Sequence, residues 1–214
     1  MEVISVLKDY LIENYGYNEP IFVNDVFVDG MTDNALRQNF NRLLQNGDIE
    51  RFDTGIYYLP KSDGILRKSY LDSNKVINKK YITDGSKIYG YVTGFLFANQ
   101  IGLTSQNPVI TEIVSNEESS KGRDVTIGTK RVRIKRPKAM VTNENYKELQ
   151  LLDLIGNYEN WAEYDADEVK KHLIRYIREK ELNRNVVKQY LDNYSGVVAR
   201  RLIEMELIYE FASL

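Results

Sequence analysis

The sequence feature that most constrains the fold is a helix pattern followed at once by a hairpin pattern, between Thr32 and Pro60. Thr32 is suited to cap the helix and Gly47 to end it. Between them, apolar residues recur at the spacing of one buried helical stripe, at Leu36, Phe40, Leu43 and Leu44. Two short strand-like runs, 49–52 and 56–59, then flank a three-residue turn, Asp53-Thr54-Gly55, whose glycine suits a bulged hairpin.

The residues before Thr32 complete a recognisable order of elements. A first amphipathic helix is marked by Ile4, Leu7, Leu11 and Tyr15. Residues 21–23 favour a short strand, and Asn24 is placed to cap a brief helix that ends at Asp29-Gly30. Helix, strand, helix, helix and hairpin is the order of a winged helix-turn-helix, so we expect residues 1–60 to form a DNA-binding domain of that type.

The long helix of this domain carries a face rich in groups that can read bases. Opposite the apolar stripe lie Asn34, Arg37, Gln38 and Asn41, and no acidic residue lies between Asn34 and Gly47. Arginine can pair with two acceptors of guanine, and asparagine or glutamine with adenine, in the major groove. A polar helix face is by default only a solvated face. Exposed helices usually mix lysine with glutamate, however, and this composition favours DNA contact.

Composition and charge limit the protein class. The chain has 214 residues, 43% of them hydrophobic, and no cysteine. It contains no apolar run long enough to cross a bilayer and no signal-peptide pattern. We therefore expect a cytoplasmic protein without disulfides and without a membrane partner. A zinc site is excluded in practice, since there is one histidine and no cysteine.

The charges are segregated along the chain. Residues 1–60 contain 4 basic and 10 acidic residues, a net charge of −6. Residues 61–140 contain 15 basic and 7 acidic residues (net +8), and residues 141–214 contain 10 basic and 14 acidic residues (net −4). An acidic reading domain supplies little of the phosphate attraction on which DNA affinity depends. We expect two copies on adjacent half-sites, or help from cations after the wing, namely Lys61, Arg67 and Lys68.

The remainder is expected to form a second domain. Residues 61–64 have the breakers of a linker, and residues 65–214 predict a mixed α/β domain ending in a helical cap, so the fold class is α+β. Helices are expected near 73–81, 94–101, 166–180, 184–190 and 197–210, with another opened by Thr142 and Asn143, and a strand at 109–114.

The strongest charge feature is the run from Lys130 to Lys138. As a strand it would bury Val132 and Ile134 and display a basic face. Three interpretations stay open: a solvated or edge strand, a second contact with DNA phosphates, or a docking surface for an acidic or RNA-bearing partner. The candidate contact residues are Lys130, Arg131, Arg133, Lys135, Arg136 and Lys138.

The sequence offers no convincing catalytic constellation, so we expect no enzyme, no catalytic or metal-binding residues and no cofactor. His172 is the only histidine and stands beside two lysines, which is typical of a surface residue. Asp165 and Asp167 sit where the first turn of a helix favours acids.

Several segments together resemble the AbiEi-like antitoxins, from the N-terminal helix to about Ile155. They are TDNALRQNFNRLLQNGDIERFDTGIYYLP, KIYGYVTGFLFANQIGLTSQNP, VSNE and NYKELQLLDLI. The resemblance implies the regulator of a type IV toxin-antitoxin (abortive infection) pair, which binds inverted repeats in its own promoter and counteracts a nucleotidyltransferase-like toxin. It implies a DNA-reading role for Asn34, Arg37, Gln38, Asn41 and Arg42, and a wing role for Arg51 and Thr54. Together with Thr32 at the start of the helix, these residues are the candidate DNA contacts.

Two functional hypotheses follow. The first is a sequence-specific DNA-binding autorepressor and antitoxin. The second is a protein or RNA interaction module with a degenerate winged helix, working through the basic strand at Lys130 to Lys138.

Overall fold

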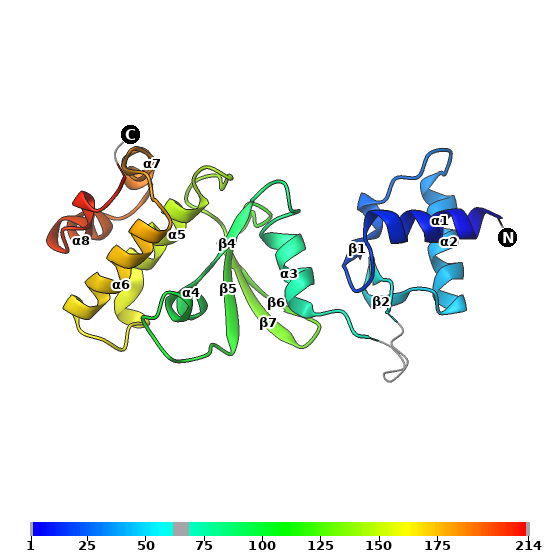
Figure 1. Cartoon of the computed structure of the whole chain (residues 1–214), viewed down its shortest axis with the longest axis horizontal. Coiled ribbons are helices and arrows are strands. Elements are labelled where there is room, and N and C mark those ends of the chain that lie inside the picture. The colour runs from blue at the N-terminus through cyan, green and yellow to red at the C-terminus, as the bar shows by residue number, and fades with distance from the viewer. Residues whose placement is uncertain (1, 62–68, 213–214) are drawn as a thin grey trace. The chain divides into compact units, whose positions relative to one another are not determined.

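The protein is a mixed α+β chain, described by a computed structural model over residues 2–61 and 69–212 (Figure 1). It divides into two compact units, Met1–Lys79 and Lys80–Leu214. Within the described residues there are eight α-helices and two β-sheets, which confirms the expected α+β class. Over those same residues, no helix has the length and apolar character needed to cross a membrane. Residues 62–64 of the predicted linker lie outside the described residues.

The N-terminal unit combines helices with a small antiparallel sheet. The sheet order is β1-β3-β2, so the first strand pairs with the last. In chain order the elements are α1 (Glu2–Asn14), β1 (Ile21–Phe22), a 3-10 turn η1 (Val23–Asp25), α2 (Asp33–Asn46), β2 (Glu50–Asp53) and β3 (Ile56–Tyr58).

Helix α2 has the boundaries and the buried stripe that the sequence predicts. The Thr32 hydroxyl accepts a hydrogen bond from the Ala35 amide at 3.3 Å, and Gly47 ends the helix with φ +74°. Three of the four predicted stripe residues are buried, and Leu44 is half-buried. They pack with α1 and the strands in a core that contains Leu7, Leu11, Ile21, Val26, Leu36, Phe40, Leu43, Ile49 and Leu59.

The expected brief helix after Asn24 is wrong. The chain makes only the 3-10 turn η1, in which Asn24 is an internal residue. The Val23 amide instead donates to the Gly55 carbonyl at 3.0 Å, which ties this segment to the hairpin. The following Val26-Phe27-Val28 run is β-branched and aromatic, and such residues favour extended backbone over helix.

The second unit is built on a mixed four-stranded sheet of order β4-β5-β7-β6. β7 runs parallel to β5 and antiparallel to β6, and β4 runs antiparallel to β5. The strands are β4 (Gly90–Thr93), β5 (Ile110–Ser115), β6 (Arg123–Ile127) and β7 (Lys130–Lys135). The basic strand is therefore an inner strand, and the edge-strand interpretation is wrong, because β6 and β5 take up its two edges. Strands β4 and β6 were not predicted.

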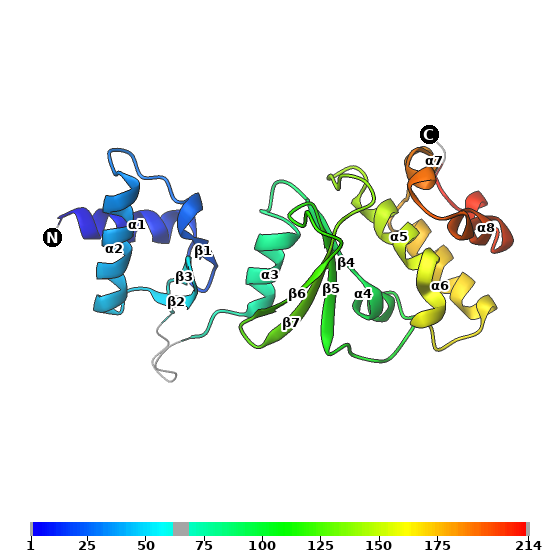
Figure 2. The same cartoon turned by 180° about the vertical axis from the view of Figure 1, so that it is seen from behind.

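Helices α5 to α8 gather on one side of this sheet (Figures 1 and 2). The predicted helices agree with α3 (Ser73–Tyr81), α4 (Gly94–Gln100), α6 (Ala166–Glu179) and α7 (Arg184–Tyr190). α5 (Tyr146–Asn157) begins after Asn145, later than Thr142 suggested. The last predicted helix is divided into α8 (Gly196–Glu204) and a 3-10 turn (Leu207–Tyr209).

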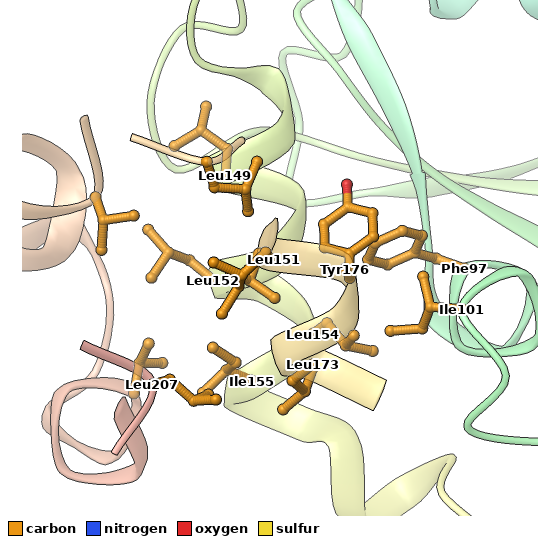
Figure 3. Packing of buried hydrophobic residues seen from close by; sticks show 14 of the residues in the cluster. Phe97, Ile101, Leu149, Leu151, Leu152, Leu154, Ile155, Leu173, Tyr176 and Leu207 are labelled. Carbon is orange, nitrogen blue, oxygen red and sulfur yellow. The ribbon is translucent and has the colours of Figure 1, made fainter. Parts of the chain in front are cut away.

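The core of this unit is centred on α5. Leu149, Leu152 and Ile155 are fully buried, and Phe97 of α4 meets Tyr176 of α6 edge to face with ring centroids 5.3 Å apart (Figure 3). Gln150, on the same helix, donates to the Val92 carbonyl at 2.8 Å and accepts from the Tyr176 hydroxyl at 3.0 Å. α5 is thereby fixed against β4, which positions its polar residues beside the sheet.

Candidate functional site

The exposed side of α2 carries the residues that sequence reasoning selected for base reading. Asn34, Arg37, Gln38 and Asn41 are all exposed, and their side chains make no hydrogen bond or ion pair with any residue that the structure describes. Gln45 is also exposed and lies four residues after Asn41, on the same side of the helix. Sequence reasoning missed Gln45, although the i, i+4 spacing would have found it. We call these five residues the α2 polar face.

Arg42 lies beside this face and is partly engaged. Its Nη1 atom donates to Oδ1 of Asn39 at 3.5 Å, and Asn39 is itself buried, with Nδ2 3.7 Å from Sδ of Met31. Thr32 acts as the N-cap of α2 rather than as a free hydroxyl. Arg42 and Thr32 therefore have structural contacts that the five residues of the α2 polar face lack.

The β2–β3 hairpin brings the two predicted wing residues together. Arg51 donates from Nη2 to the Thr54 hydroxyl at 3.0 Å and from Nε to the Asp53 carbonyl at 3.3 Å. The Thr54 amide donates to the Asp53 carboxylate at 2.6 Å, and Gly55 has φ +73°. Phe52 is an extra residue in the strand register, so the hairpin is bulged as expected. Arg51 and Thr54 are both exposed at its tip.

Of the three cations expected to contact phosphates just after the wing, only Lys61 lies within the described residues. Lys61 follows the end of β3 that is opposite to the hairpin tip, and its amide donates to the Ser69 hydroxyl at 2.8 Å. Arg67 and Lys68 lie outside the described residues.

The second unit contains a large open cavity of about 940 Å³ on the sheet face beside α5. Six cations and three carboxylates line it. We call this cavity the basic hollow. Its lining residues are Thr93, Glu112, Val114, Lys121, Gly122, Arg123, Asp124, Arg133, Lys135, Arg136, Lys138, Asp153, Asn157, Asn160 and Trp161.

The basic strand supplies this cavity only in part. Val132 and Ile134 are fully buried, as the alternating pattern predicts. Arg133, Lys135, Arg136 and Lys138 reach the hollow, whereas Lys130 and Arg131, at the start of the strand, are not among its described lining residues. Sequence reasoning missed Lys121 and Arg123, which come from a loop and from the unpredicted strand β6.

Ion pairs neutralise much of the predicted basic face. Arg133 donates from Nε and Nη2 to the two oxygens of Asp124, at 2.7 and 2.8 Å, and this contact lowers the pKa of the Asp124 carboxyl. Lys135 pairs with Glu112, and Arg123 with the buried Glu118 at 2.7 Å. Arg136 and Lys121 make no such contact with the described residues.

Asp153 contacts both a buried core residue, Tyr91, and a cation of the hollow, Lys138. Its carboxylate accepts from the Tyr91 hydroxyl at 2.6 Å and lies 3.0 Å from Nζ of Lys138. Burial, together with the charge of Asp153, raises the pKa of Tyr91 well above its usual value. Lys138 also lies 4.0 Å from the ring centroid of Tyr194. The i, i+4 spacing of Asp153 and Asn157 on the C-terminal half of α5, which is otherwise mostly apolar, was the signal for this wall.

His172 and Asp165 have structural contacts, and Asp167 lies in the first turn of α6. Nδ1 of His172 lies 3.0 Å from the Ile101 carbonyl at the end of α4, and its ring stacks on Tyr164. Asp165 caps α6 by accepting from the Glu168 amide at 3.0 Å, as expected for a helix-start acid. Over residues 2–61 and 69–212, no group of three or more His, Cys, Asp or Glu side chains is placed to hold a metal ion.

Comparison with known proteins gives a family but no named relative. No curated protein matches the chain. One family model, described as a family of unknown function (DUF6088), matches residues 14–186, which include the α2 polar face, the hairpin and the whole basic hollow. The chain therefore belongs to the DUF6088 family.

Proposed function

We propose that this protein is a sequence-specific DNA-binding autorepressor and the antitoxin of a type IV toxin-antitoxin pair. Its N-terminal unit would be a winged helix, with α2 in the major groove and the β2–β3 hairpin as the wing. Its DNA target would be inverted repeats in its own promoter, reached in the cytoplasm. The resemblance to AbiEi-like antitoxins is the basis for the antitoxin role and for a nucleotidyltransferase-like toxin as its counterpart.

The observation that carries the DNA-binding proposal is that the side chains of the α2 polar face are exposed and unpaired among the described residues. Its five side chains are exposed and make no hydrogen bond or ion pair with the described residues, so their donors and acceptors are available to base edges. A surface helix selected only for solubility usually carries lysine and glutamate in such positions, whereas this face has four amides and one guanidinium. Amide and guanidinium groups are those that pair with adenine and guanine in the major groove.

The negative charge of the N-terminal unit is expected to lower the affinity of a single copy for DNA. Phosphate attraction supplies most non-specific affinity, and residues 1–60 have a formal net charge of −6. We therefore expect two copies on adjacent half-sites to be needed for a stable complex, and a single copy to bind weakly.

The test is fluorescence anisotropy with the duplex upstream of the chain's own gene. Arg37→Ala is expected to weaken specific binding by about 1–3 kcal/mol and to relax the base preference at one position. The matched control is Arg200→Ala, because Arg200 is an exposed arginine of the second unit with only a loose 3.8 Å pair to Glu204. If Arg37→Ala binds like the wild type, or if no duplex binds at moderate salt, α2 is not a reading helix.

The antitoxin role has its own test. The neighbouring gene is expected to encode a nucleotidyltransferase-like protein whose expression stops growth, and co-expression of this chain is expected to restore it. A neighbour of another class, or no rescue by the full chain, contradicts the antitoxin proposal without affecting DNA binding.

A second candidate function is a protein or RNA interaction module that works through the basic strand. The observation favouring it is the convergence of Arg133, Lys135, Arg136 and Lys138 on one cavity. Neutralising Arg131, Arg133 and Lys135 together would then abolish function and leave operator binding intact. Loss of operator binding in this variant would instead make the strand a DNA phosphate contact.

A further inference from the structure

The basic hollow has an excess of positive charge that base reading by α2 does not use. Two of its six cations, Arg136 and Lys121, have no carboxylate partner among the described residues. Arg136 follows the end of β7, and Lys121 lies in the loop before β6, so the two come from separate segments of the wall. A cavity with unpaired cations on two of its segments is suited to an anionic ligand.

The paired arginines add donors whose positions are already fixed. Arg133 uses Nε and Nη2 on Asp124, and Arg123 uses Nε on Glu118. A guanidinium carries five N–H donors, so each arginine keeps donors that are not engaged by these carboxylates. Since the ion pairs hold the two groups in place, little side-chain freedom is lost when a phosphate accepts from them.

The lining beside α5 has a different chemistry. Trp161 lies there with the amides of Asn157 and Asn160. An indole ring can stack on a nucleobase, and amides can pair with the polar edge of one. The cavity volume, about 940 Å³, falls within the range of about 300–1,000 Å³ that is usual for small-molecule sites.

We propose that the basic hollow binds a free nucleotide. The phosphates would be held by Arg133, Arg136 and Lys121, and the base would stack on Trp161. This proposal goes beyond DNA recognition, because all of its residues belong to the second unit and none belongs to α2 or the hairpin.

The chain provides its own reporter for the test, since Trp161 is its only tryptophan. The full-length protein without DNA is titrated with ATP, GTP, CTP and UTP in turn. Trp161 fluorescence is corrected for nucleotide absorption with free N-acetyltryptophanamide, and calorimetry gives an independent affinity. We expect saturable quenching by at least one nucleotide, which weakens as salt is added.

Single substitutions of basic residues distinguish a specific binding site from a surface that attracts nucleotides by charge alone. Arg136→Ala is expected to weaken binding about tenfold, the loss typical of one charge-assisted hydrogen bond. Arg131→Ala is the matched control, because Arg131 is an exposed arginine of β7, five residues before Arg136, that is not among the lining residues of the hollow. Lys121→Ala is a second test, at an exposed residue that makes no ion pair with the residues that the structure describes. Circular dichroism melts verify that each variant is folded.

Four results would overturn the proposal. The first is the absence of saturable binding by any nucleotide at millimolar concentration, and the second is equal weakening by Arg136→Ala and Arg131→Ala. The third is binding of inorganic triphosphate as tightly as the best nucleotide, which would remove the role of Trp161. If a single-stranded RNA oligonucleotide binds more tightly than every nucleotide and depends on Arg136, the hollow is an RNA site and the free nucleotide is the wrong ligand.

Discussion

The Arg51 guanidinium is hydrogen-bonded to the Thr54 hydroxyl at 3.0 Å across the tip of the β2–β3 hairpin. The two exposed residues to which the family resemblance gave a wing role are thus in direct contact. This contact and the Asp53 carbonyl orient the guanidinium at the tip, where an isolated arginine would sample many rotamers.

The first prediction concerns this pair. Arg51→Ala is expected to weaken operator binding to a similar extent on all duplex sequences and to lower the salt dependence by about one phosphate contact. Thr54→Val, which keeps the shape but removes the acceptor, is expected to have a smaller effect in the same direction. Anisotropy titrations over a salt series measure both. A change of base preference in Arg51→Ala would contradict a phosphate contact.

The second prediction concerns Gln45, at the C-terminal end of the α2 polar face. Gln45→Ala is expected to cost about 1–3 kcal/mol on the preferred operator and much less on unrelated DNA. Asn46→Ala is the matched control, because Asn46 is the exposed next residue, turned about 100° away around the helix. Equal losses in the two variants would show that the helix end, and not the base contact, had been disturbed.

The third prediction concerns the stability of the N-terminal unit. Thr32→Ala removes the acceptor for the Ala35 amide and is expected to lower the free energy of unfolding by about 0.5–2 kcal/mol. Thr32→Ser keeps the hydroxyl and is expected to stay close to the wild type. Urea unfolding, followed by circular dichroism, compares the two variants. Equal losses of unfolding free energy would mean that the hydroxyl cap does not stabilise the unit.

The fourth prediction concerns the close approach of β4 to its neighbours. A Cβ atom on Gly90 would lie 2.0 Å from the Tyr81 carbonyl oxygen and 2.7 Å from that of Val114. Both are backbone atoms, so Gly90→Ala is expected to destabilise the second unit by about 3 kcal/mol or more. Gly196→Ala is the control, since a Cβ there meets nothing within 4 Å. Thermal unfolding that is equal for both would show that β4 can move aside.

The fifth prediction concerns acid. The Glu118 carboxylate accepts from the Ser120 hydroxyl at 2.6 Å, the Ser120 amide at 2.9 Å and Arg123 at 2.7 Å, and these bonds lower its pKa from the ordinary 4.5. A lowered pKa means that this stabilisation is complete above about pH 4.5 and is lost as the pH falls through the folded value.

Glu118→Gln is therefore expected to be less stable than the wild type at pH 7, and the difference is expected to shrink below pH 4.5. Melting temperatures measured from pH 7 to pH 3 give the comparison. A difference that stays constant over this range would assign the effect to packing rather than to ionisation.

The elements that sequence reasoning predicted correctly are those fixed by local signals. The cap at Thr32, the stop at Gly47 and the alternation of Val132 and Ile134 each depend on residues within one or two turns or strands. The 3-10 turn at Asn24 shows the limit, because a long-range bond from Val23 to Gly55 replaced a locally plausible helix.

The basic hollow was only half predictable for a similar reason. Four of the six expected cations of the Lys130–Lys138 run reach it, but the carboxylates that balance them come from separate elements, at Glu112, Asp124 and Asp153. β6 also gave a weak strand signal, because its sequence RDVTI begins with two charged residues. Charge balance across a sheet depends on strand order, which no single stretch of sequence encodes.

The parallel pairing of β5 with β7 has a consequence for the order of folding. β6 and β7 are joined by two residues, so this hairpin closes locally, whereas the β5–β7 pairing must enclose the whole of β6 in a loop. Long loops close at a greater entropic cost, and non-local pairings form later. The hollow is lined by Glu112 of β5 and Arg133 of β7, so it is completed only when these two strands pair. A ligand held there would select the finished sheet and slow its opening.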